Sequence, residues 1–559
     1  MIGPAVVARR VPRSLDSDKL VAAGLALAVA IPLFVFVVLP LSSILARSFV
    51  TPNGYGIDNY IQYFSDARFI GIVGNSLLVA TCATTITVVL AYGFAYAMHR
   101  SAMPFKSILR LVALMPLFAP SLVQALGVLF LLGRNGLINR TFDLGIDIYG
   151  FWGIVVSDVF YSFPHAYLIL SAALAVADAR LYESARTLGA SDLRMFFTVT
   201  LPSTKYGLMS AIFVLFTIVI TDFGNPMVIG GDYDVLATEI YNQVSGQANF
   251  EMGAVIGMVL LVPAAIAVAV EKWVTRRQYT LIGAHSQPLT VRPHRRFDTA
   301  MLVYASIICL GIISVVGIVF FASFVKLWPY DMSFSLRHYA FDVQNGMEPL
   351  WTSIIVSLIA AVIGIVFVIG AAFVIHKIRN RLMRVLYFMS ILPAAVPGMV
   401  LGLGYILAFN DPDNPVYAIY GTLLILAICN VYHYHAQGFL IATTSVKQVS
   451  DTFDEASATL GAGFLRTMRC ITLPIIWPSM ISVGVFFFVR SMVTLSAVIF
   501  LITPATQLAA VSVLLLDDSG NQNQAAAFSV CIMLVVAAAL ILFQALLRIC
   551  GVRGESLIR

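Results

Sequence analysis

The chain has 559 residues, of which 60% are hydrophobic and only 11% are charged, and its mean hydropathy is +0.92. Soluble globular proteins have a smaller apolar share and roughly a quarter of charged residues, so this composition excludes them and predicts an all-α, polytopic membrane protein embedded in lipid. The formal net charge of +6 does not indicate a nucleic-acid partner, because the basic residues are confined to segments between apolar runs.

Twelve apolar stretches are long enough to cross a hydrocarbon core, which takes about 20 residues of α-helix. The predicted spans cover residues 20–45, 71–97, 107–133, 150–177, 204–228, 252–271, 300–325, 351–376, 383–409, 416–443, 475–503 and 524–549. No small-residue cleavage site follows the first stretch, so we expect it to be a retained helix rather than a removed signal peptide.

The basic residues indicate which connections lie in the cytoplasm. Most of the 34 Lys and Arg residues precede the first span or follow an even-numbered span, whereas the other connections hold few. By the positive-inside rule, these segments and both termini are cytoplasmic. The six cysteines form no CxxC pair, so neither a disulfide framework nor a metal site is predicted.

Several features recur after a nearly constant number of residues. The pairs that lie 277 positions apart are Ser76 and Ser353, His99-Arg100 and His376-Lys377, Pro116 and Pro393, Pro120 and Pro397, and Gly127 and Gly404. An internal repeat of this length predicts two six-span halves in parallel orientation. We place the first half at residues 1–275, a cytoplasmic linker at 276–298 and the second half at 299–559.

A polar, charged signature is the most specific repeated feature. Its equivalent positions are Glu183 and Glu455, Gly189 and Gly461, and Pro202 and Pro474, in the loops 180–202 and 452–474. Each glycine can end a short helix, each proline can start the next one, and each glutamate suits the positive end of a helix dipole. An ordinary helix–loop–helix connection is the simpler interpretation, but two copies with identical spacing favour a helix that projects to bind a partner.

These two segments resemble the EAA motif of the inner-membrane permease subunits of binding-protein-dependent ABC importers. The resemblance covers essentially the whole chain, although Ser184 and Ser457 stand where the family often has alanine. It implies that the loops dock two copies of an ABC ATPase subunit and that a periplasmic solute-binding protein delivers the substrate. The docking positions it implies are Glu183, Ala185, Gly189, Pro202, Glu455, Gly461 and Pro474.

The chain itself has no nucleotide chemistry. It lacks a G-x-x-x-x-G-K-[ST] sequence, so it is not the ATPase and is not expected to be an enzyme. The resemblance implies that ATP and Mg are bound by the partner ATPase and that this chain carries no cofactor of its own.

A narrower similarity is to the fused permeases that serve ferric-iron and 2-aminoethylphosphonate uptake, carried by residues 221–231, 490–500 and 515–520. It implies a multi-pass subunit of a bacterial inner membrane that moves a small solute from periplasm to cytoplasm. We expect 2-aminoethylphosphonate or a related phosphonate or organophosphate as the substrate, with ferric iron as the alternative. A proton-coupled secondary transporter has no use for twin docking loops, and nothing in the chain resembles a signalling domain, as a receptor would require.

Two ionisable residues are predicted inside spans, where a charge is costly and therefore points to function. Asp222 lies toward the outer part of the fifth span and Arg490 lies in the eleventh, at comparable depth. We expect the substrate pathway to be lined by Asp222, Asn225, Arg490 and Thr494. One interpretation is a polar constriction in which Arg490 binds an oxyanion and Asp222 attracts a cation. The other is a structural salt bridge between the two.

Three histidines fall in the fourth and tenth spans, at His165, His433 and His435. Iron ligation is one interpretation, but a metal site should also contain carboxylates, so hydrogen bonding within the core is favoured. The repeated prolines can kink the spans as gate hinges or as static bends.

Overall fold

The computed structural model describes residues 14–176, 178–279, 291, 293–341, 346–378 and 381–549. Both ends of the chain and most of the linker predicted at 276–298, including several of the basic residues used to assign the topology, lie outside the described residues.

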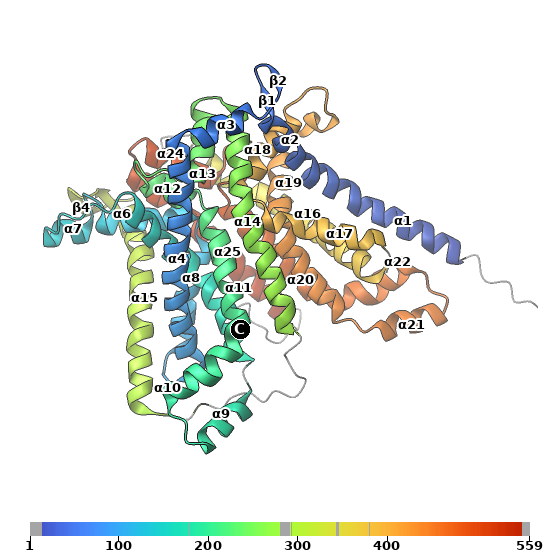
Figure 1. Cartoon of the computed structure of the whole chain (residues 1–559), viewed down its shortest axis with the longest axis horizontal. Coiled ribbons are helices and arrows are strands. Elements are labelled where there is room, and N and C mark those ends of the chain that lie inside the picture. Colours follow the sequence, from blue (N-terminus) through green and yellow to red (C-terminus); the bar gives the residue numbers. More distant parts are fainter. Residues whose placement is uncertain are drawn as a thin grey trace, which may run out of the picture.

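The described residues are almost entirely helical (Figure 1). The helices of the first half are α1 (Ser14–Leu33), η1 (Phe34–Val38), α2 (Leu39–Ser48), α3 (Asp58–Ser65), α4 (Ala67–Arg100), α5 (Lys106–Leu114), η2 (Met115–Phe118), α6 (Ser121–Leu132), α7 (Leu137–Phe142), α8 (Phe151–Ala175), α9 (Ala179–Thr187), α10 (Asp192–Met195), η3 (Phe196–Thr200), α11 (Leu201–Ile220), α12 (Gly224–Ile229), α13 (Leu236–Tyr241), η4 (Asn242–Gly246) and α14 (Phe250–Tyr279).

The second half repeats this order with small differences. Its helices are α15 (Arg295–Ser323), η5 (Arg337–Tyr339), α16 (Glu348–Lys377), α17 (Arg381–Ile391), η6 (Leu392–Ala395), α18 (Gly398–Phe409), η7 (Pro415–Ile419), α19 (Leu423–His433), α20 (His435–Lys447), α21 (Asp451–Thr459), α22 (Phe464–Thr467), η8 (Met468–Thr472), α23 (Leu473–Val493), α24 (Ala509–Asp518) and α25 (Gln522–Ile549). Two antiparallel hairpins are the only sheets in the described part of the chain, and each follows the first span of its half. They pair β1 (Val50–Thr51) with β2 (Gly54–Tyr55) and β3 (Val325–Leu327) with β4 (Asp331–Phe334).

The number of spans agrees with the sequence prediction. Within the described residues, ten helices are long and apolar enough to cross a membrane, and there are up to twelve if two bent pairs are counted as single spans. The prediction of an all-α membrane protein is therefore confirmed.

Several predicted spans are not continuous helices, which corrects the sequence analysis. The third and ninth spans break before Pro120 and Pro397, where Ala119 and Val396 adopt extended backbone angles, and the ninth bends by 113°. A proline offers no N–H and disfavours helical angles in the residue before it, which explains both breaks. The tenth span bends by 62° at Tyr434.

The fifth and eleventh spans end earlier than predicted. Helix α11 stops at Ile220 rather than continuing to residue 228, and α23 stops at Val493 rather than at 503. The residues that follow are mostly apolar and largely buried, so composition alone made them look like membrane helix.

The first span of each half packs on the opposite half. Helix α2 packs on α18, and α15 packs on α6. Both contacts depend on a repeated glycine, because a Cβ atom on Gly127 would lie 2.3 Å from the carbonyl oxygen of Val315, and one on Gly404 would lie 2.9 Å from that of Pro40. Close approach of small residues is the usual way in which helices associate in membranes. The two halves are thus interlocked by an exchange of their first helices.

The predicted topology leads to a labelling experiment. Cysteines introduced at the exposed positions Arg296 and Gln247 of a cysteine-free variant should react from opposite sides of the membrane. A membrane-impermeant maleimide added to intact spheroplasts should label the Gln247→Cys variant, whereas the Arg296→Cys variant should react only after permeabilisation. Labelling of Arg296→Cys in sealed spheroplasts would reverse the predicted orientation.

Candidate functional site

The two signature loops fold in the same way. Helices α9 and α21 end at Gly189 and Gly461, whose φ angles of +73° and +75° lie in the left-handed region that favours glycine. The N–H of the residue after each glycine donates to a carbonyl five residues back, from Ala190 to Ala185 and from Ala462 to Ser457, both at 3.0 Å. These are the bonds of a Schellman cap. In Figure 1, both helices project from the lower part of the molecule, away from hairpin β1–β2.

The structure corrects two details of these loops. Glu183 and Glu455 are each the fifth residue of a nine-residue helix, so they lie at mid-helix rather than at the positive end of the dipole, and both are exposed. Pro202 and Pro474 are the second residues of α11 and α23, as predicted, but these helices continue directly from the shorter helices before them. Each follows a five-residue π-helical turn in a helix that begins at Asp192 or Phe464, and this turn accommodates the missing N–H.

Sequence analysis missed two apolar residues in the docking loops. Leu188 and Leu460 directly precede the repeated glycines, and each is 87% exposed. Their equal position and exposure identify them as candidate contacts for a protein partner, since contact surfaces combine apolar and charged side chains. The signal was present in the sequence as a leucine repeated at the same place beside a polar turn.

Asp222 lies in the break between two helices rather than inside the fifth span. Its Oδ2 accepts a 2.9 Å hydrogen bond from the backbone N–H of Asn225, which fixes the start of α12. The Asn225 Nδ2 donates in turn to Oδ1 of Asp158 at 2.8 Å, and Asp158 and Asn225 are completely buried. Sequence analysis did not select Asp158, although an aspartate inside the predicted fourth span was the available signal.

The second half has an uncharged residue at the position of Asp158, and this residue makes a related contact with a different partner. Asn430 lies 272 positions after Asp158, the offset of the signature loops, and its Nδ2 donates to the Ser491 hydroxyl at 2.6 Å. Both side chains connect the fourth span of a half to the end of its fifth span. Asp158 is therefore used as a hydrogen-bond acceptor that holds the turn carrying Asp222.

We expect Asp158→Asn to transport within about twofold of the unaltered chain, because the new amide oxygen still accepts from Asn225. Asp158→Leu should lower thermal stability, because a buried polar group left without a partner costs about 1–3 kcal/mol. The melting temperature of the purified variants and their uptake check both expectations. A stable Asp158→Asn variant without transport would show that the carboxyl group is required as such.

Asp222 and Arg490 line the same small cavity. It has a volume of about 40 Å³ and lies between the broken spans of the two halves. The polar residues that line it are Ser121, Tyr161, His165, Asp222, Tyr434, Arg490, Thr494 and Ser496. A volume of about 10–15 Å³ holds one water molecule on this measure, so the cavity has room for only a few waters.

Arg490 bonds to neutral partners. Its guanidinium lies 3.0 Å from His165 Nε2 and stacks 5.7 Å from the centre of the Tyr434 ring. No carboxylate lies within 4.0 Å of it among the described residues, so the predicted salt bridge with Asp222 is not formed in this structure. Thr494 accompanies this group, because its hydroxyl donates to Tyr434 at 3.0 Å or to the Arg490 carbonyl at 2.5 Å.

The three histidines do not form a metal centre. His165 belongs to the Arg490 cavity, whereas His435 is stacked between the aromatic rings of Tyr432 and Phe439. No group of three or more His, Cys, Asp or Glu side chains suited to a metal ion occurs in the described part of the chain.

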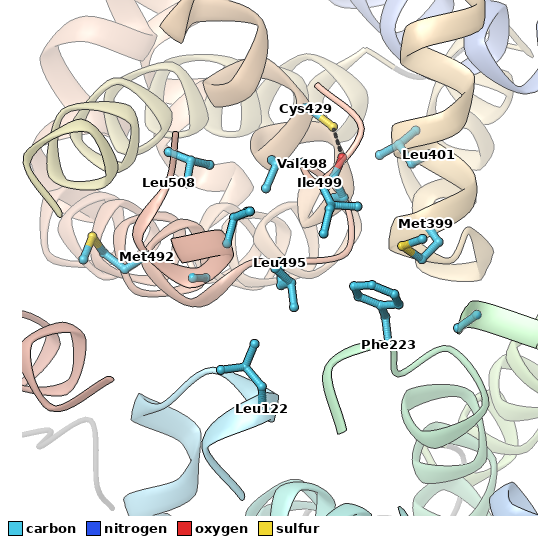
Figure 2. Close-up of a cluster of buried hydrophobic side chains, with 14 of the residues drawn as sticks. Leu122, Phe223, Met399, Leu401, Cys429, Met492, Leu495, Val498, Ile499 and Leu508 are labelled. Atoms are coloured by element: carbon cyan, nitrogen blue, oxygen red, sulfur yellow. Dashed lines mark hydrogen bonds between the residues drawn. The ribbon is translucent and has the colours of Figure 1, made fainter. Parts of the chain in front are cut away.

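Four apolar side chains from the two halves belong to the buried cluster shown in Figure 2, and two of them, Phe223 and Leu495, also line this cavity. Leu122 and Met399 are the second residues of α6 and α18, the later parts of the broken third and ninth spans, and Phe223 and Leu495 follow the ends of α11 and α23. They form two repeat-related pairs, 277 and 272 positions apart, and all four are buried. These four buried residues are called the central plug below.

Comparisons with known proteins agree with the arrangement of the loops and spans. The model of the family described as binding-protein-dependent transport system inner membrane component matches residues 88–278 and 368–549. The chain is 29% identical to the ferric transport system permease protein FbpB of Actinobacillus pleuropneumoniae, over 95% of this chain and 79% of that protein. It is also 29% identical to the putative ferric transport system permease protein FbpB 1 of Haemophilus influenzae, over 88% and 80%.

More distant matches cover single halves. The molybdenum transport system permease protein ModB of Escherichia coli is 29% identical over 36% of this chain and 91% of its own length. A solved bacterial ABC transporter involved in alginate import aligns with 48% of this chain and 98% of its own chain, with 18% identity and a TM-score of 0.40.

Proposed function

Because the chain belongs to the family of inner-membrane components of binding-protein-dependent transport systems, we propose that it forms the whole membrane channel of an ABC importer. The observation that carries this proposal is the pair of projecting helices α9 and α21, which end in the same glycine-centred cap and expose the same glutamate and leucine. Each would bind one ATPase subunit, and these subunits would bind ATP and Mg. A solute-binding protein would deliver the substrate to the opposite face.

The proposed transport mechanism starts from the buried central plug. When the two ATPases come together on ATP binding, they would move the docking helices, and the halves would rotate against each other. The central plug divides between the halves, since Leu122 and Phe223 belong to one and Met399 and Leu495 to the other. Rotation would therefore separate the plug and open a path for the substrate.

Ferric iron is the substrate that the comparisons favour, because the two relatives matched over most of the chain are described as ferric transport permeases. The sequence analysis gave iron as its alternative and a phosphonate as its first choice, and no comparison supports the phosphonate specifically. One observation keeps an oxyanion such as a phosphonate as a second candidate. Arg490 faces the cavity without a carboxylate partner, which suits an anion better than a cation.

An uptake experiment separates the two candidates. The chain would be expressed with the ATPase and the solute-binding protein encoded beside it, in a host that lacks its own iron and phosphonate importers. We expect ATP-dependent uptake of radiolabelled ferric iron and none of radiolabelled 2-aminoethylphosphonate. Uptake of the phosphonate alone would select the second candidate, and uptake of neither, with an assembled complex, would exclude both.

A further inference from the structure

The cytoplasmic end of α16 is fastened to the second docking helix. Lys377, the last residue of α16, extends its ammonium group to Asp451 Oδ1 at 3.2 Å and also bonds to Asp454 Oδ2. The Lys377 side chain is only 9% exposed. Asp454 directly precedes the signature residue Glu455 in α21, so the contact lies at the centre of the docking helix.

The first half has the same contact, made by different side chains. Arg100, the last residue of α4, lies 277 positions before Lys377, and Tyr182 lies 272 positions before Asp454. The Arg100 guanidinium stacks 5.2 Å from the centre of the Tyr182 ring and donates to the Leu174 carbonyl at 2.9 Å. A cation–π contact thus replaces the ion pair. The shared feature is the position of the contact rather than the residue type.

The opposite ends of the same two helices carry a second repeated contact. The Ser76 hydroxyl of α4 accepts from the backbone N–H of Leu236, which begins α13, at 2.7 Å. The Ser353 hydroxyl of α16 accepts from the backbone N–H of Ala509, which begins α24, at 2.8 Å. All four groups are buried. Both short helices lie between the last two spans of their half, on the side away from the docking helices (Figure 1).

The spacing between the two contacts is identical in both halves. Ser76 precedes Arg100 by 24 residues, and Ser353 precedes Lys377 by 24 residues, within single unbroken α-helices. At 1.5 Å per residue, each helix holds its two contacts about 36 Å apart. The third, ninth and tenth spans are broken near the centre and cannot transmit an axial displacement in this way.

We propose that α4 and α16 are rods that transmit the movement of the docking helices to α13 and α24 at the far face. Arg100 and Lys377 are the positioning residues at the docking end, and Ser76 and Ser353 are those at the far end. The inference rests on the proposed docking of an ATPase to α9 and α21. It adds the helices through which a movement caused by ATP binding would be transmitted to α13 and α24, which we call the outer mouth, because the broken spans cannot transmit it.

The test uses the complex of the full chain with its ATPase, reconstituted in lipid nanodiscs. Spin labels at Ser245→Cys, beyond α13, and Ser519→Cys, beyond α24, report the outer mouth in a background without the native cysteines. The distance between the labels is measured without nucleotide and with ATP and vanadate. Lys377→Met breaks the docking-end contact of the second half, and Lys447→Met, an exposed lysine at the end of α20, is the matched control.

We expect Lys377→Met to keep the bound ATPase and its basal hydrolysis but to lose at least half of the nucleotide-dependent change in label distance. The exchanged pair Lys377→Asp with Asp454→Lys should recover it. In the first half, Tyr182→Phe loses the hydroxyl contacts to Arg100 at 3.4 Å and to Thr200 at 2.9 Å but keeps the ring, so it should retain most of the distance change, whereas Tyr182→Leu should lose at least half of it. A full distance change in both Lys377→Met and Tyr182→Leu would overturn the proposal.

A double variant with one substitution at each end of α16 gives a second test of the proposed rod. Substitutions about 36 Å apart usually have additive effects. Substitutions at the two ends of one rod should not be additive, because the loss of either contact already interrupts the transmission. Ser353→Ala combined with Lys377→Met should therefore reduce the distance change no further than the stronger single variant does, and additive losses would contradict a rod. If Lys377→Met does not fold, Ser353→Ala alone must reduce the distance change. If the unaltered chain binds no ATPase, the proposed function is rejected, and the rod proposal is rejected with it. If the ATPase binds but the variants keep the full distance change, only the rod proposal is rejected.

Discussion

Reversing the charge of both signature glutamates, in the double variant Glu183→Lys with Glu455→Lys, is expected to reduce the ATPase copurified with the chain at least tenfold. Both carboxylates are exposed at the middle of their docking helices, where they can pair with basic groups of a partner. Losing one charged partner at a desolvated interface costs about 2–5 kcal/mol, and each 1.4 kcal/mol is tenfold in affinity. Quantitative immunoblotting of the affinity-purified chain measures the effect.

Two controls separate loss of docking from loss of folding. The matched variant Asp58→Lys with Asp413→Lys reverses two other exposed carboxylates, one at the start of α3 and one in the loop after α18, and should bind the ATPase normally. The double glutamate variant should still insert into the membrane and elute as a monodisperse peak in size-exclusion chromatography. Normal recovery of the ATPase with the double glutamate variant would refute the docking assignment.

Replacing Arg490 is the second substitution expected to have a large effect, and its direction depends on the substrate. If the substrate is an oxyanion, Arg490→Lys keeps the charge but loses the planar fork of donors, so uptake should fall about tenfold or more. If the substrate is ferric iron, Arg490→Leu should leave uptake unchanged or raise it. Initial uptake rates of both radiolabelled solutes, normalised to folded yield, distinguish these results.

The same variants test whether Arg490 and Asp222 are counterions in another state of the transport cycle. Removing one partner of a buried ion pair is strongly destabilising, by about 3–5 kcal/mol, whereas replacing both is often tolerated. Because the two residues are not paired in this structure, we expect Arg490→Leu and Asp222→Asn to keep near-normal folded yield, since the amide oxygen of the new asparagine still accepts from the Asn225 N–H. Low yield of each single variant, restored together with transport in the double variant, would identify the pair as a structural salt bridge.

The docking loops could be located from the sequence because their information is local. A helix cap of this kind needs a residue in the left-handed conformation, which favours glycine, at a fixed distance from the end of the helix. The sequence meets both requirements at Gly189 and again at Gly461. The membrane class and the number of spans follow in the same way from the lengths of the apolar runs. The placement of Glu183 toward the start of its helix was wrong, because helix boundaries depend on capping bonds rather than on residue type.

Only the tertiary structure decided what happens at the centre of the membrane. Hydropathy measures transfer into an apolar environment, and a buried turn between helices is as apolar as a helix facing lipid, so the breaks near Phe223 and Leu495 were invisible in the pattern. The partners of Asp158, Arg490 and Lys377 come from helices tens to hundreds of residues away, and no sequence interval specifies them. The repeat in the sequence determined that the two halves are alike. The packing of their broken helices decided that a plug and a single asymmetric polar cavity lie between them, because side chains from both halves have to meet there to exclude lipid and water.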